Sequence, residues 1–222
     1  MPTKSSCDVA PLRRCAFTLV EVLIVIGILA LLIGLLFPVM SRVRASGRNS
    51  VCVSNLHQLG QAIQLYAQDY DRYPRGLDPA DKYTPVIWSG HPAAQGGVLS
   101  TTPLLPVVMG AYIKSPSLWH CPSDFGFDVV DVTGVPLDAR PGCYDKFGMS
   151  YFYRSEITLL NLAEDHLPNP VETNILADAD GLWHGSSFLG STKRRYNVLF
   201  GDGHVKNVDN EAYFRAWDVP IQ

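Results

Sequence analysis

Two successive hydrophobic patterns in the first 73 residues both predict helix. From Phe17 to Met40 the chain reads FTLVEVLIVIGILALLIGLLFPVM, in which Glu21 is the one ionisable side chain. At about 1.5 Å per residue, a helix of this length crosses the roughly 30 Å hydrocarbon core of a bilayer. A cleaved secretory signal has a shorter apolar stretch that is followed by small residues. The pattern therefore predicts a transmembrane helix over residues 17–40 that is retained in the mature chain.

The second pattern continues the helix over residues 41–73. Apolar residues recur there at spacings of three and four with glutamines between them, which is typical of an amphipathic helix. The helix is expected to end near Tyr73, because Pro74 forbids continuation. We expect a sheet to bury this stripe. A coiled coil is the alternative, but the stripe spans two and a half heptads, which is short for a coiled coil. The apolar positions are Cys52, Leu56, Leu59, Ile63, Tyr66 and Tyr70.

Residues 74–222 predict a turn-rich globular head. Most of the 18 glycines and 16 prolines lie beyond residue 70. A short helix is expected over residues 104–112, and Gly201-Asp202-Gly203 predicts a tight hairpin turn. The fold class is therefore α+β, with a long N-terminal helix packed against a small antiparallel sheet. The strand signals, rich in alternating or β-branched residues, lie at residues 149–156, 171–179 and 194–208.

Composition narrows the classes of partner. The chain has 222 residues, 18 lysines and arginines, 21 aspartates and glutamates and a net charge of −3. A charge of this sign offers no basic field for a phosphate backbone, so nucleic acid is not an expected partner. The length suits one core with an attached apolar segment.

Glu21 is the most informative residue of the apolar segment. A carboxylate near the start of an apolar helix is costly unless it is partnered, protonated or close to the interface. If the chain is cut between Ala16 and Phe17, the new amine lies four residues before Glu21. The amine of a neighbouring subunit would then pair with this carboxylate and set the assembly register. Protonation or an interfacial position is the alternative.

The residues around this position resemble a known signal. The run RRCAFTLVE, residues 13–21, is similar to the class III signal of type IV prepilins and type II secretion pseudopilins. The resemblance implies that a prepilin peptidase cuts between Ala16 and Phe17 and methylates the new amine, and that Glu21 guides docking. Pro38 falls where many members have a helix-kinking proline. Ala16 departs from the more usual glycine, which implies slower processing at worst.

The same resemblance implies location and partners. Residues 1–16 would be a cytoplasmic leader, and the protein would cross the inner membrane once, with a periplasmic head, before it enters a filament. Its partners would be the prepilin peptidase, membrane lipid, other pilin or pseudopilin subunits and an inner-membrane assembly platform with a cytoplasmic ATPase. Whether the filament is a secretion pseudopilus or a surface pilus stays open.

The C-terminal part is similar to a prepilin subgroup that is associated with planctomycete-like bacteria. In that subgroup a histidine stands ten positions before the aspartate of the final Asp-Gly pair. This chain has Thr192 there, and its nearest upstream histidine is His184. The similar stretches are LWHCPSD (118–124), GMSYFY (148–153), ADADG (177–181) and NVLFGDGHV (197–205).

The five cysteines include no CxxC pair and no zinc-like spacing, which argues against a structural zinc site. Cys121 and Cys143 lie in the turn-rich part with 21 residues between them. A disulfide between them would add roughly 3 kcal/mol in an oxidising compartment. Two unrelated thiols are the alternative, because spacing alone does not bring two Cα atoms together.

Asp178, Asp180 and Asp202 are the candidate metal ligands. For Asp180 and Asp202 the first interpretation is turn chemistry, because aspartate bonds nearby backbone amides, and no cofactor is then expected. The alternative is calcium, which binds carboxylate and carbonyl oxygens and which some similar pseudopilins hold in a C-terminal loop.

Catalytic motifs are absent from the sequence. No GxSxG, HExxH or phosphate-cradling loop occurs, and His120 and Cys121, as neighbours on a strand, would point apart. The chain is therefore interpreted as a structural subunit of a pseudopilus or pilus-like filament and not as an enzyme. The alternative is a membrane-anchored envelope protein that does not polymerise and binds a polysaccharide or an ion through its head. Its candidate sugar-stacking residues are Trp88, Trp119, Trp183 and Trp217.

Overall fold

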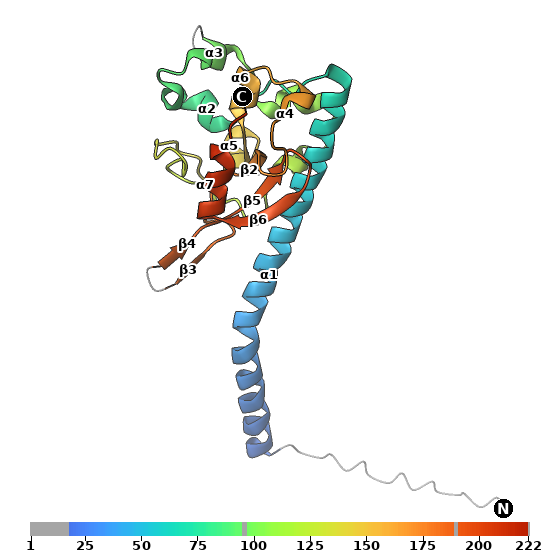
Figure 1. Ribbon diagram of the computed structural model, residues 1–222. Coiled ribbons are helices and arrows are strands. Elements are labelled where there is room, and N and C mark those ends of the chain that lie inside the picture. The colour runs from blue at the N-terminus through green and yellow to red at the C-terminus, as the bar shows by residue number, and fades with distance from the viewer. Residues whose placement is uncertain (1–17, 95–96, 189–190, 222) are drawn as a thin grey trace, which may run out of the picture. The chain divides into compact units, whose positions relative to one another are not determined.

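The computed structural model of the protein describes residues 18–94, 97–188 and 191–221 (Figure 1). The chain divides into two compact units, with the boundary between Val43 and Arg44. The helix α1 (Leu19–Tyr70) contributes residues to both units.

The first unit contains the N-terminal residues of α1. Apart from position 38, every side chain described from Thr18 to Val43 is exposed, and most of these side chains are large and apolar. The helix assignment runs through position 38. This segment is long and apolar enough to cross a membrane, which agrees with the transmembrane prediction for its length and composition.

The residues of α1 in the second unit bury the predicted apolar stripe as far as Ile63, whereas Tyr66 is half-buried and Tyr70 is exposed. Cys52, Leu56 and Leu59 have no exposed surface, and Ile63 is 2% exposed. They pack into the core of the second unit, which confirms burial against a sheet and not in a coiled coil. Asp71 follows the helix with a φ of 55°, a left-handed conformation that stops α1 just before the predicted end.

The sheet of the second unit has the antiparallel order β1-β2-β5-β6. All three predicted strand regions are confirmed, and the turn at residues 201–203 joins β5 to β6 as expected. β2 pairs with β5 through Leu176 with Leu199 and Ala177 with Val198. The strands are β1 (Tyr151–Tyr153), β2 (Asn174–Asp178), β5 (Arg195–Phe200) and β6 (Val205–Asp209).

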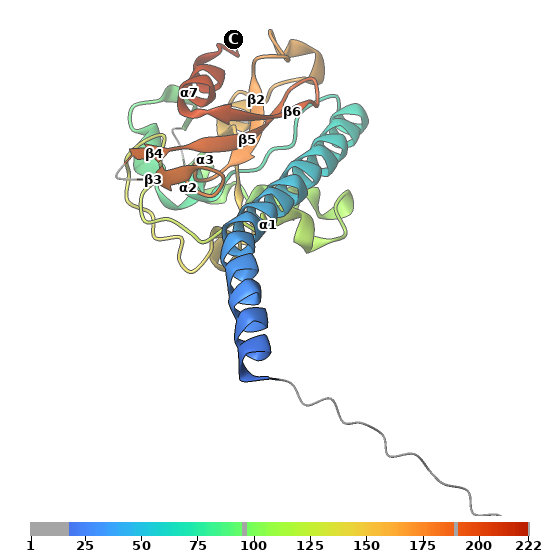
Figure 2. The ribbon, with the colours of Figure 1, turned by 90° about the horizontal axis from the view of Figure 1, so that it is seen from below.

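The alternation of side chains along these strands builds two hydrophobic clusters. Leu176 and Leu199 belong to the larger cluster, which also holds the buried stripe of α1. Ala177 and Val198 point to the other cluster, which α7 (Asn210–Asp218) covers. Figure 2 shows residues 44–70 of α1 and α7 on either side of the sheet.

Gly60 allows α1 to approach the sheet closely. A Cβ atom at this position would lie 2.7 Å from Cδ1 of Leu199 on β5. A larger residue would force the Leu199 side chain, the helix or the strand to shift, so the glycine permits this close approach.

Short elements complete the second unit. The predicted helix at residues 104–112 is confirmed as α4 followed by η3. α7 and the β3–β4 hairpin were not expected from the sequence. The remaining elements are α2 (Pro79–Tyr83), η1 (Pro85–Trp88), η2 (Pro92–Ala94), α3 (Val98–Thr101), α4 (Leu105–Val108), η3 (Met109–Ala111), η4 (Pro116–Trp119), α5 (Cys143–Phe147), α6 (Ser155–Leu159), η5 (Glu164–His166), β3 (Ser186–Phe188) and β4 (Ser191–Lys193).

Candidate functional site

Thr18 and Glu21 form a reciprocal pair at the start of α1. The backbone N–H and the hydroxyl of Thr18 donate to Oε2 of Glu21 at 2.8 and 2.9 Å. The backbone N–H of Glu21 donates in return to the Thr18 hydroxyl at 3.2 Å. This is a capping box, in which a threonine before the helix and a glutamate three residues later satisfy the first free amides. The T-x-x-E spacing of residues 18–21 is the sequence signal for this capping box.

The capping box places the Glu21 carboxylate at the helix N-terminus, where the helix dipole favours a negative charge. Among the described residues, Oε1 of Glu21 accepts no hydrogen bond. One oxygen therefore holds the local helix start, and the other is available to a further donor. Ala16 and Phe17, the predicted processing residues, lie outside the described residues.

The predicted disulfide between Cys121 and Cys143 is wrong. Cys121 is bonded to Cys52 of α1, with their Cα atoms 4.9 Å apart, and Cys143 is a free, buried thiol. Cys52 was interpreted only as one apolar position of the helix stripe, and a separation of 69 residues gave no sign of the contact. The bond ties α1 directly to the loop that follows η4.

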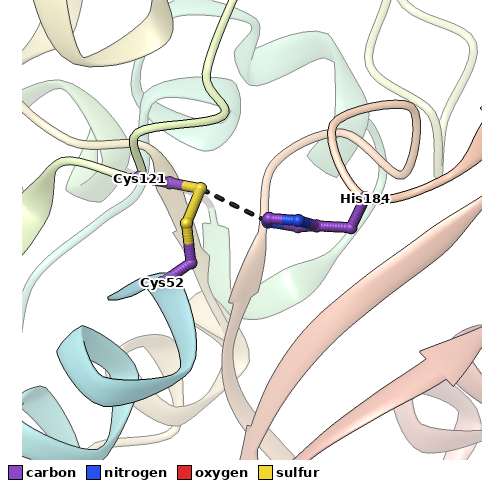
Figure 3. A group of neighbouring side chains, drawn as sticks. All are labelled: Cys52, Cys121 and His184. Carbon is purple, nitrogen blue, oxygen red and sulfur yellow. Dashed lines mark hydrogen bonds between the residues drawn. A yellow bond between two sulfur atoms is a disulfide. The ribbon is translucent and has the colours of Figure 1, made fainter. Parts of the chain in front are cut away.

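His184 lies against this disulfide (Figure 3). Its Nε2 atom is 3.3 Å from Sγ of Cys121 and 3.4 Å from Oδ2 of Asp178 at the end of β2. Burial lowers the pKa of His184 to about 4, helped by the charge of Arg48. Burial raises the pKa of Asp178 to about 8, although hydrogen bonds from Asn197 act in the opposite direction. Burial therefore favours the uncharged form of both groups.

Asp124, in the CPSD stretch, organises the loops around this cluster. Its carboxylate accepts hydrogen bonds from the backbone amides of Gly126, Cys143 and Tyr144 and from the hydroxyl of Ser150, at 2.7–3.0 Å. Ser150 in turn accepts from the amide of Cys121 at 3.1 Å. The aspartate therefore holds α5, β1 and the disulfide loop together.

The structure does not bring the three predicted calcium ligands together. Asp178 is fully buried and accepts from the amide of Asn197, and Asp180 accepts from the amide of Leu182. Asp202 lies in the exposed β5–β6 turn. The backbone amide of Asp202 donates to the carbonyl of Pro170, which precedes β2 at the end of the strand opposite to Asp178. The calcium hypothesis for this trio is therefore wrong, and the hydrogen bonds of Asp180 and Asp202 are those of turn aspartates.

The tryptophans fall into two groups. Trp119 and Trp183 are 3% and 7% exposed and belong to the core, so they are not sugar-stacking platforms. Trp88 and Trp217 line a pocket of about 140 Å³ together with Asp78, Asp81 and Glu156. The indole N–H of Trp88 donates to Asp81 at 2.6 Å. This pocket, with its carboxyl, aromatic and aliphatic lining, gives the binding alternative a structural basis in the second unit.

The carboxyls of this pocket predict a pH dependence of stability. Burial raises the pKa of Asp81 to about 6 and that of Asp78 well above its ordinary value, with mutual repulsion as the next cause for Asp78. A raised pKa means that the folded protein holds the proton more tightly than the unfolded chain. The protonated carboxyl of Asp81 therefore contributes its full share to the free energy of unfolding below about pH 4. This contribution is lost as the pH rises through about 6.

In wild type the free energy of unfolding should decrease between about pH 4 and pH 6. We expect Asp81→Asn to remove roughly 3 kcal/mol of this decrease. Chemical unfolding of the full chain in mild detergent at several pH values measures this change. Asp218→Asn, at an exposed position, is the matched control and should leave the slope unchanged. An Asp81→Asn variant with the wild-type slope would contradict the assignment.

Comparison with known families identifies the class to which these features point. Residues 12–37 match the family described as "Prokaryotic N-terminal methylation motif". This match covers the predicted cleavage position and the start of α1, and the fold combines a long N-terminal helix with a small antiparallel sheet. The chain is therefore a prepilin-like protein with a pilin-like α+β fold, a structural protein and not an enzyme.

The particular similarity is to a secretion component. The chain is 28% identical over 139 residues to the "Type II secretion system core protein G" of Aeromonas hydrophila, across 61% of this chain and 92% of that protein. No solved structure matches the chain. The chain is thus similar to that secretion protein over most of the relative's length, and among the described residues α1 is long and apolar enough to anchor a pilin-like subunit in a membrane.

Proposed function

We propose that the protein is a filament subunit of a type II secretion pseudopilus or a closely similar pilus. A prepilin peptidase cuts the chain between Ala16 and Phe17, methylates the new amine, and leaves the mature subunit anchored in the inner membrane by the first part of α1. The leader faces the cytoplasm, and the second unit lies on the opposite side. The observation that carries the proposal is the methylation motif at residues 12–37, placed directly on an exposed apolar helix.

Burial of the exposed apolar side chains of α1 supplies the cohesion of the filament. At about 25 cal/mol per Å² of apolar surface, a helix that is exposed on all sides gains stability from any partner that covers it. Lipid covers it before assembly, and neighbouring helices cover it afterwards. Small residues such as Gly27 and Gly34, whose Cβ positions have no neighbour within 4 Å, leave room for close helix packing.

Glu21 supplies the register of assembly. The free Oε1 oxygen accepts the methylated amine of Phe17 from the next subunit, while Oε2 keeps the capping box with Thr18. The pairing takes place among apolar side chains, where an unpaired charge is costly. A subunit that docks one step out of register therefore leaves its carboxylate alone.

Recovery of filaments tests this function against the anchored alternative. The full chain is overproduced in cells that contain a prepilin peptidase, an assembly platform and its ATPase, and sheared surface fractions are examined. We expect the mature chain in filaments that disappear when the ATPase is inactivated. A mature chain that stays in the membrane fraction under both conditions would favour the anchored protein, with the pocket at Trp88 and Trp217 as its binding site.

A further inference from the structure

The disulfide pair and His184 form a group of metal-binding donors that the filament role does not use. Sγ of Cys52, Sγ of Cys121 and a ring nitrogen of His184 all lie within 4.8 Å of one another. They come from α1, from the loop after η4 and from the loop after β2, and Figure 3 shows the imidazole directed at the sulfur of Cys121. Three distant parts of the chain thus bring sulfur and nitrogen donors to one point.

The surroundings of the group are those of a closed metal site. Both cysteines are completely buried, and the His184 side chain is 3% exposed. The buried carboxylate of Asp178 lies 3.4 Å from the same ring nitrogen, and its Oδ1 atom has no hydrogen-bond partner among the described residues. Asp178 is therefore the nearest further oxygen donor, and water is the other candidate for a fourth position.

We propose that Cys52, Cys121 and His184 bind a zinc ion when the disulfide is reduced. Two thiolates and an imidazole are a borderline-soft donor set that suits Zn²⁺ and does not suit calcium or magnesium. The Cα atoms of the two cysteines are 4.9 Å apart, so modest side-chain rotation separates the sulfurs enough to share one ion. This site is not visible in the sequence, because its three ligands have none of the short spacings of zinc motifs.

The chemistry of the two states balances. A phosphine reductant transfers two electrons to the S–S bond and takes an oxygen atom from water, so it becomes a phosphine oxide and leaves two thiols. Zn²⁺ then displaces the two thiol protons and binds both thiolates together with the neutral imidazole. The disulfide and the zinc ion are therefore alternative links between α1 and the loop after η4.

The same geometry disfavours a nucleophilic cysteine. In a Cys–His–carboxylate triad, the carboxylate contacts the ring nitrogen that faces away from the sulfur. Here Asp178 and Cys121 both lie next to Nε2 of His184. His120, the histidine next to Cys121 in the sequence, packs against the ring of Tyr144 in a tilted arrangement instead. Convergence of several donors on one point is the arrangement of a metal site.

Metal titration of the full chain in detergent tests the proposal. The protein is reduced with a phosphine, which does not compete for zinc as dithiols do, and is then titrated with Co²⁺ and with Zn²⁺ without oxygen. We expect one metal ion per reduced chain, with the visible bands of tetrahedral cobalt and a thiolate charge-transfer band that Zn²⁺ removes. The oxidised chain should bind no ion at this group.

Variants separate this site from adventitious binding. His184→Ala and Cys52→Ser should weaken zinc binding by at least about 100-fold, the upper end of what loss of an outer-shell partner costs. His57→Ala, at an exposed position of α1 five residues after Cys52, is the control and should bind like wild type.

Each outcome of this experiment is decisive. A folded, reduced wild type that binds no zinc, or His184→Ala with wild-type affinity, would overturn the proposal. If the reduced chain unfolds without metal, recovery of its circular dichroism spectrum on addition of Zn²⁺ supports the site, and failure to recover rejects it. The cobalt spectrum of the wild type needs no variant, and none of these results depends on filament formation.

Discussion

Replacing Glu21 with alanine should abolish filament formation while the subunit still enters the membrane and is processed. The substitution removes the one carboxylate of the apolar segment, and with it the acceptor for the neighbouring amine. Loss of one partner of a desolvated charge pair leaves the other partner alone in an apolar setting. We expect docking to weaken on the order of 100-fold, enough to reduce filaments in sheared fractions below detection.

The capping box adds a finer expectation to this experiment. Thr18→Val keeps the shape of the side chain but removes the hydroxyl that exchanges hydrogen bonds with Glu21. The carboxylate is then present but less well held, so filament yield should fall between that of wild type and Glu21→Ala. Val22→Ala, a neighbouring change without charge, is the matched control. Normal filaments from Glu21→Ala would show that this carboxylate does not set the register.

Reduction of the Cys52–Cys121 disulfide should lower the stability of the full chain by about 4 kcal/mol. The bond closes a loop with a sequence separation of 69 residues, and a constraint of this length removes much entropy from the unfolded chain. Domains of this size are stable by only about 5–15 kcal/mol in total, so the effect is large. Chemical unfolding in mild detergent, with and without reductant and with a metal chelator present, measures it.

Two variants make this measurement specific. The double variant Cys52→Ser with Cys121→Ser should be insensitive to reductant. Cys143→Ser should keep the full sensitivity of wild type, because Cys143 is a free thiol. A wild type whose unfolding does not respond to reductant, or a Cys143→Ser variant that loses the response, would reject the observed pairing in favour of another one.

The sheet and the long helix were predictable because their signals are local. The strand regions around Ile175, Val198 and Val205 show the β-branched residues and flanking turn residues that are typical of strands. The stripe of α1 was readable from its spacing of three and four. In both cases neighbouring residues alone carry the information.

The site was less predictable because its contacts are non-local. Cys52 fits an apolar helix position as well as a disulfide partner, and nothing in its local sequence indicates Cys121. Asp178 and Asp202 lie in neighbouring strand regions of the sequence. The antiparallel pairing of β2 with β5 nevertheless places Asp178 at one end of β2 and Asp202 near the other end. α7 was missed because it has nine residues, although Asp209 caps it in the usual way by accepting from the amide of Ala212.

The state of the N-terminus tests the central claim most directly. The full-length chain is produced in cells that contain a prepilin peptidase, recovered from membranes, and analysed by intact-mass measurement and N-terminal sequencing. The prepilin assignment predicts a mature chain that begins at Phe17 and carries one additional methyl group. A chain that retains residues 1–16, or that is cut at any other position, would contradict it.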